Sequence, residues 1–236
     1  MLVGLASVRW SWGAPHGYLP YGVAAGVLGT AGLVAFYWAL AAGPMGLVAA
    51  IASTAVLLPV LVGVGHGERP GTLRFVAIAL TILGIVLASG AQLRGGQRAA
   101  WSTILLSLVA AVGFGGYYTA MAGGAQHDLT MVLVTQRISG LLIVGPLLLR
   151  SRISVGFSGK DLALAAAIGL GDVAANAAYG LATRNGLLSV VAVLASLYPL
   201  VTALLARSLL RERLRPAQRV GAFTAVTGVL LLAATG

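Results

Sequence analysis

The stretch "RERLRPAQRVGAFTAVTGVLLLAATG" at residues 211–236 follows the same pattern as "GERPGTLRFVAIALTILGIVLASG" at residues 67–90. Each begins with a charged turn and continues as an apolar run long enough to cross a bilayer. An offset of 144 residues (212 minus 68) aligns Glu68 with Glu212 and Gly84 with Gly228. The pattern predicts a duplicated helical unit.

The composition places the chain in the membrane. Of its 236 residues, 59% are hydrophobic and only 8% are charged, whereas soluble domains carry about a quarter of charged residues. The net charge of +10 comes mostly from arginines between apolar runs, where such charges set membrane topology, so nucleic-acid binding is not expected. The chain has no cysteine, which excludes disulfides and thiolate sites. We expect a multi-pass protein of the plasma or inner membrane.

The fold predicted from the apolar runs is an all-α, polytopic membrane bundle with eight transmembrane helices. Runs of about 20 apolar residues span a bilayer, and these runs lack the alternation of an outer-membrane barrel. The predicted helices cover approximately residues 17–42, 45–64, 72–91, 100–122, 130–149, 161–182, 186–209 and 217–235.

The offset of 144 also carries the run at 17 onto 161 and the run at 45 close to 186. Residues 1–91 are therefore predicted to form an incomplete first repeat of three full helices, and residues 99–236 a second repeat of five. Projecting the helices at 100 and 130 back by the same offset implies that about 45 N-terminal residues are lacking; a genuine eight-helix variant is the alternative. An odd number of helices per repeat makes the repeats inverted, as in secondary transporters.

Residues 189–233 carry a family pattern: a Ser-Leu-Tyr-Pro step ending at Pro199, a Glu-Arg-Leu turn beginning at Glu212, and a last helix with Gly221 and Gly228. This pattern resembles the EamA type of the drug/metabolite transporter superfamily. The resemblance implies ten helices in two inverted five-helix repeats, and transport of amino acids, metabolites or drugs through a central cavity. The chain departs from it by placing Ala55 opposite Pro199 and by lacking two N-terminal helices.

Two oppositely charged residues lie inside apolar runs. Asp172, Asn176 and Tyr179 share one helical face at i, i+4 and i+7. Arg137 precedes Arg150 by 13 residues, and Asp172 follows Lys160 by 12 (150 minus 137; 172 minus 160). At about 1.5 Å per residue, both lie roughly 18–20 Å from the connecting loop, near the middle of the bilayer.

Two interpretations of this pair stay open. In one, Arg137 and Asp172 form a structural pair that fixes helix packing, and Asp172 stays ionised. In the other, they line a substrate cavity, where an unpaired Asp172 could carry a proton in exchange for substrate. Either alone would cost roughly 2.5–3.5 kcal/mol at the bilayer centre.

Other residues complete the predicted site. Tyr117 and Tyr198 are candidates for substrate contact, and Pro199 removes a backbone hydrogen bond and permits a hinge. Gly22 and Gly26 form a small-xxx-small pair that favours close helix packing. Glu68 falls at a loop edge, where we expect it to serve the turn and to pair with an arginine.

The function predicted from these features is secondary transport by alternating access, with export as the expected direction. The expected partners are a small-molecule substrate, the lipid bilayer, a proton coupled to transport, and a second copy in a homodimer. No nucleophile with a base, no Walker motif and no metal-ligand spacing is visible, so we expect no enzyme activity, cofactor or metal. The alternative is a truncated or degenerate membrane subunit that packs with partners and transports nothing.

Overall fold

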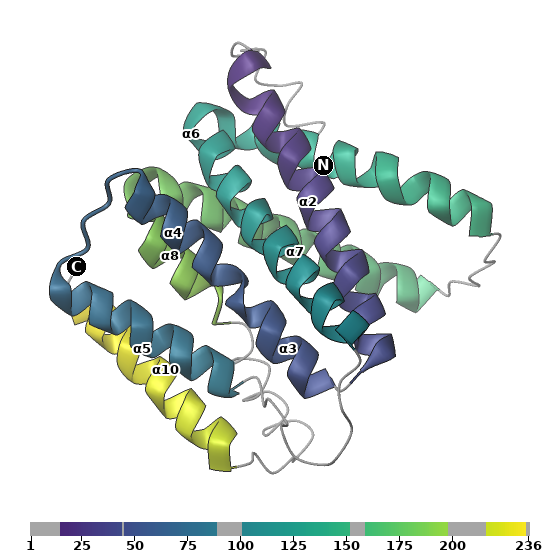
Figure 1. The fold of residues 1–236 in the computed structure, drawn as a ribbon. Coiled ribbons are helices and arrows are strands. Elements are labelled where there is room, and N and C mark those ends of the chain that lie inside the picture. Colours follow the sequence, from purple (N-terminus) through teal and green to yellow (C-terminus); the bar gives the residue numbers. More distant parts are fainter. Residues whose placement is uncertain (1–14, 44, 89–100, 152–158, 198–215, 235–236) are drawn as a thin grey trace. The chain divides into compact units, whose positions relative to one another are not determined.

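The computed structural model describes residues 15–43, 45–88, 101–151, 159–197 and 216–234, drawn as ribbons in Figure 1. These residues form helices and contain no strand, which confirms the predicted all-α class. The elements are α2 (Pro15–Ala42), α3 (Met45–Ser53), the 3-10 turn η1 (Thr54–Val56), α4 (Leu57–Gly65), α5 (Thr72–Ala88), α6 (Trp101–Ser151), α7 (Gly159–Asn185), α8 (Leu188–Ala195) and α10 (Pro216–Ala234).

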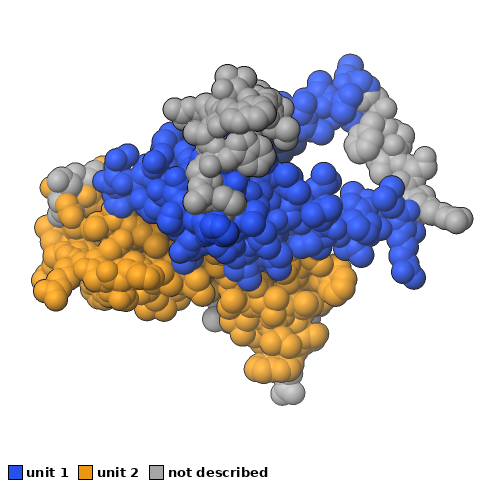
Figure 2. Space-filling view, turned by 90° about the horizontal axis from the view of Figure 1, so that it is seen from above, with its two compact units in different colours: residues 1–30, 119–186 blue, residues 31–118, 187–236 orange. Residues whose placement is uncertain are grey.

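The chain forms two compact units, which Figure 2 colours separately. Unit 1 comprises residues 1–30 and 119–186, and unit 2 comprises residues 31–118 and 187–236. Each unit therefore draws on both halves of the sequence, and the chain passes from one unit to the other within α2 and within α6. The predicted repeats, 1–91 and 99–236, were defined by sequence similarity, whereas these units are defined by compactness. The repeat boundaries therefore stay a prediction.

Four helices of the described residues are long and apolar enough to cross a membrane: His16–Ala42, Leu47–Gly65, Trp101–Arg150 and Gly159–Asn185. Thr72–Leu87 and Arg219–Leu232 are shorter apolar helices. These helices agree with a multi-pass membrane protein. The count of eight spans and the inversion of the repeats stay predictions.

The longest of these helices, α6, has a break at Asp128. A straight helix of its 51 residues would measure about 75 Å, more than twice the thickness of the hydrocarbon core. Asp128 has non-helical angles (φ −151°, ψ 107°), and its Oδ1 accepts a hydrogen bond of 3.0 Å from the Met131 N–H. This is the geometry of an N-cap, so α6 consists of two helices in series, residues 101–127 and 129–151. Each is long enough to span the bilayer.

The span formed by α3, η1 and α4 is irregular at its centre. Pro59 lies in the first turn of α4, and a proline has no N–H to donate to the carbonyl four residues earlier and clashes with that carbonyl. That carbonyl belongs to Ala55, within η1. The irregularity therefore falls at the residue that the repeat aligns with Pro199, although Ala55 itself is not a proline. Pro199 lies outside the described residues.

In unit 1, α2 packs closely against the second part of α6. A Cβ atom added at Gly22 would lie 2.6 Å from the Thr135 Cβ, and one at Gly26 would lie 2.7 Å from the Gln136 carbonyl oxygen. Both distances are shorter than any van der Waals contact, so only glycine fits at these positions. The predicted small-xxx-small packing is confirmed.

In the same unit, α7 runs antiparallel to the end of the first part of α6 and to the second part. The Gln126 amide donates to the Thr183 carbonyl oxygen at 2.8 Å, and a Cβ atom at Gly180 would clash with Leu129. Residue numbers thus fall along one helix as they rise along the other. This register decides which polar side chains of the two helices meet.

In unit 2, α5 and α10 lie side by side (Figure 1). A Cβ atom at Gly84 would lie 2.6 Å from the Ala225 Cα, and one at Gly228 would lie 2.8 Å from the Ala77 carbonyl oxygen. The two backbones touch at these glycines, and the order of the contacts makes the helices antiparallel. The neighbouring core cluster contains side chains of α4, α5, α8 and α10 together with Val56 of η1: Val56, Val60, Ala77, Ile78, Ala192, Val193 and Leu232.

We expect Gly84→Ala to lower the free energy of unfolding by about 1–3 kcal/mol, because its methyl group would overlap backbone atoms that cannot rotate away. Gly169→Ala is the matched control. Gly169 also lies within a helix, but nothing lies within 4 Å of its added Cβ, so alanine there should be neutral or stabilise by up to about 1 kcal/mol. Denaturant-induced unfolding in mixed micelles measures both, and equal effects would contradict the close contact of α5 with α10.

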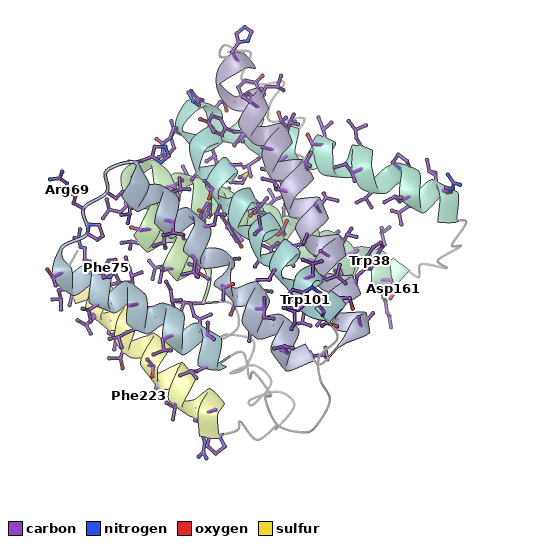
Figure 3. All side chains as sticks on the ribbon, viewed as in Figure 1. Trp38, Arg69, Phe75, Trp101, Asp161 and Phe223 are labelled. Atoms are coloured by element: carbon purple, nitrogen blue, oxygen red, sulfur yellow. The ribbon has the colours of Figure 1, made fainter. Side chains whose placement is uncertain are left out.

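The surface of both units is apolar. Large hydrophobic side chains are exposed along the described helices, among them Trp38, Phe75, Trp101 and Phe223, which Figure 3 labels. In water such surfaces would drive aggregation, whereas in a bilayer they face acyl chains and the aromatic rings suit the interfaces. A membrane environment thus explains both the exposed apolar surface and the scarcity of charged residues.

Candidate functional site

An ion pair joins two helices of unit 1. Arg137 in the second part of α6 donates through Nη2 to Oδ2 of Asp172 in α7. The two helices form an antiparallel hairpin, and the pair lies 13 residues from one side of its turn and 12 from the other. The ion pair agrees with the equal distance of the two residues from the loop, and their depth in the bilayer stays a prediction.

The pair is accessible from outside unit 1. The Arg137 side chain is 39% exposed and the Asp172 side chain is 53% exposed. The charges attract each other while part of each remains open to another group. The Asp172 carboxylate can therefore still receive a donor, and the Arg137 guanidinium can still receive an acceptor.

The helical face that continues from Asp172 along α7 turns inward. Asn176 and Tyr179 are 8% and 5% exposed, respectively. The predicted face thus changes from exposed at Asp172 to buried one and two turns later. It presents a charged end and then an amide and a phenol, which are hydrogen-bonding groups without charge.

Gln136, next to Arg137, was not recognised from the sequence. It is 9% exposed, and its Oε1, like the Nε of Arg137, is buried with no hydrogen-bond partner among the described residues. Buried polar atoms are nearly always satisfied by protein or water. The described residues therefore leave one acceptor, Gln136 Oε1, and one donor, Arg137 Nε, without a hydrogen bond.

The remaining predicted site residues are Tyr117, Tyr198 and Pro199. Tyr117 lies in the part of α6 that belongs to unit 2, where its ring packs edge-on against Tyr118 at 5.1 Å between centroids. Tyr198 and Pro199 lie outside the described residues. The roles of these three residues stay predictions.

Among the described residues, Glu68 contacts the start of α8 and not the arginine expected from the sequence. Its carboxylate accepts hydrogen bonds from the backbone N–H groups of Leu188 and Ser189 at the start of α8. The sequence indicates that the start of α8 lacks a capping side chain of its own. Residues 185–191, which lead into α8, read "NGLLSVV". The N-cap position, Leu187, therefore holds leucine instead of a capping side chain.

The comparisons with known proteins agree with these features. The EamA-like transporter family matches residues 101–234, which is more than half of the chain. A solved structure described as "Crystal structure of protein" shares 19% identity with this chain at a TM-score of 0.68, over 100% of this chain and 95% of that chain. At this identity the likeness concerns the fold. No curated protein sequence matches the chain.

The family carries the functional conclusion that the fold alone does not. Its members are membrane transporters, and the apolar helices and the all-α class of the described residues agree with this. The chain belongs to the EamA-like transporter family.

Proposed function

We propose that the protein is a secondary transporter that exports small metabolites, amino acids or drugs by alternating access. Arg137, Asp172, Asn176 and Tyr179 of unit 1 contribute the polar part of the substrate site. The observation that carries this proposal is the accessible ion pair between two apolar helices.

The exposure of the pair favours a substrate site over a purely structural one. A charge facing acyl chains at the bilayer centre costs several kcal/mol, so the exposed part of the pair must meet protein, water or a polar ligand. A pair that only fixed packing would be more stable fully enclosed. Side chains that are 39% and 53% exposed instead suit a surface that a polar molecule visits.

The α5–α10 contact supports inverted repeats, on which alternating access would depend. The offset of 144 relates Gly84 to Gly228 and Thr81 to Ala225. Gly84 lies against Ala225, and Gly228 lies against Thr81, so exchanging the repeat partners turns one contact into the other. Because the helices are antiparallel, a two-fold relation of this kind would invert one repeat relative to the other.

The proposal predicts saturable flux in proteoliposomes. Vesicles with the purified protein should release a preloaded radiolabelled substrate from a panel of amino acids, sugars and lipophilic cations, and the release should saturate with concentration. Empty vesicles and vesicles with an unrelated membrane protein of similar size serve as controls. If no member of the panel shows protein-dependent flux, the proposal fails and the non-transporting subunit is favoured.

A further inference from the structure

The first turn of α8 has no cap from its own segment. Leu187, at the N-cap position, is extended (φ −65°, ψ 130°), and it makes no side-chain hydrogen bond to the helix. The first N–H groups of any helix lack partners within the helix. In a mostly apolar protein these donors need an acceptor from elsewhere.

Glu68 supplies that acceptor from 120 positions earlier in the chain. Its Oε1 accepts from the Leu188 N–H, and its Oε2 accepts from the Ser189 N–H at 3.1 Å. A carboxylate at a helix N-terminus is favoured by both the hydrogen bonds and the helix dipole. Glu68 therefore joins the turn between α4 and α5 to the start of α8.

The end of α4 is shaped to receive this carboxylate. A Cβ atom at Gly63 would lie 2.8 Å from the Glu68 Cδ, so any larger residue would push the carboxylate away. The Glu68 N–H donates to the Gly63 carbonyl oxygen at 3.1 Å. Below this contact, Val60 of α4 belongs to the same core cluster as Ala192 and Val193 of α8.

The turn that carries Glu68 has room to rearrange. Gly67 has a φ of +95°, which favours glycine, and Cβ atoms added at Gly65, Gly67 and Gly71 would meet nothing within 4 Å. Glu68 itself is only half-buried, so water can compete for its carboxylate. Nothing in this turn locks the carboxylate onto α8 apart from its own hydrogen bonds.

Ser189 lies directly behind the Glu68 contact. Its side chain is fully buried, yet its Oγ has no hydrogen-bond partner among the described residues. A buried hydroxyl without a partner is unfavourable. This contact thus satisfies the Ser189 N–H, whereas the Ser189 hydroxyl would gain a partner only in an arrangement that exposed it.

We propose that Glu68 is a releasable latch. In one conformation its carboxylate accepts hydrogen bonds from the start of α8 and holds it to the end of α4. In another conformation these hydrogen bonds are broken, and the end of α4 separates from the start of α8. The inference rests on the proposed function, in that alternating access needs a helix pair that parts at one end. It adds the residue that controls that parting.

Thiol labelling tests the latch without a substrate. The chain has no cysteine, so Ser189→Cys introduces a single thiol behind the latch. In proteoliposomes this parent should react with N-ethylmaleimide slowly but to completion, because the rate of reaction of a buried group follows the population of the open form. Adding Glu68→Ala or Gly63→Ala should raise the rate at least about tenfold. Adding Arg69→Gln, an exposed neighbouring charge, should change it less than about twofold.

Gly63→Ala is the decisive variant because it displaces the carboxylate and keeps Glu68. Unchanged rates in both Glu68→Ala and Gly63→Ala would overturn the latch. A parent thiol that never reacts in the folded protein, or a loss of helical circular dichroism in the variants, would show a permanent structural tie and would equally overturn it. If the labelling rates change as expected but no flux is measured, the proposed transport is contradicted and the latch is still supported.

Discussion

Asp172→Asn is expected to lower the saturable flux about 100-fold while the protein stays folded. The substitution keeps the size of the side chain but removes its charge, so Arg137 loses its ion-pair partner and the site loses its anionic group. A loss of about 100-fold corresponds to about 2.7 kcal/mol, which is comparable to the cost of an unpaired charge within the membrane. Initial rates of release from proteoliposomes, at substrate concentrations above and below saturation, measure the effect.

Asp161→Asn is the matched control for this variant. Asp161 lies in the first turn of α7, the same helix, and its replacement removes a charge of the same kind near a helix end. The interaction of this charge with the helix dipole accounts for about 0.3–1 kcal/mol of stability, and flux should stay near that of the parent. Equal flux in Asp172→Asn and the parent would remove Asp172 from the mechanism and would favour the structural interpretation of the pair.

Arg137→Gln and Asp172→Asn are expected to be coupled in stability. Each single variant leaves one unpaired charge between apolar helices and should lower the free energy of unfolding. The double variant leaves none, so its loss should be smaller than the sum of the single losses by about 1 kcal/mol. This value is taken from the low end of the range for contacting residues, because both side chains are partly exposed and solvent weakens their attraction.

A double-mutant cycle by reversible unfolding in bicelles gives this coupling directly. Arg184→Gln with Asp172→Asn is the control cycle, because Arg184 lies in the last turn of α7, far along the helix from Asp172, and distant sites should be additive. Additive losses in the Arg137 cycle would mean that the ion pair does not hold α6 to α7. The same cycle measured by flux would then show whether the two residues act on the substrate separately.

The helices could be predicted because their signal is local. Four of the described helices are long and apolar enough to cross the bilayer, and in lipid a spanning segment has to satisfy its own backbone hydrogen bonds. The spacing of Gly22 and Gly26 predicted close packing for the same reason, since two small residues four apart share a face. That Arg137 and Asp172 can meet followed from counting residues from one turn.

Other features depended on residues far apart or on one specific side chain. Runs at 100–122 and 130–149 were predicted as separate helices, and the structure joins them through Asp128, whose carboxylate caps the second. The break at Ala55 comes from Pro59, four residues later. Neither follows from hydropathy, because both result from single hydrogen bonds made or lost within otherwise apolar runs.

The sequence by itself determined the membrane class and the helical architecture, because these follow from composition, run length and periodicity. Only the tertiary structure decided that Glu68 caps α8, that Gln136 is buried beside the ion pair, and that Gly84 and Gly228 bring α5 and α10 into backbone contact. These contacts join segments separated by tens to more than a hundred residues. Their energies arise from the packing and hydrogen bonding of surfaces that no local pattern in the chain describes.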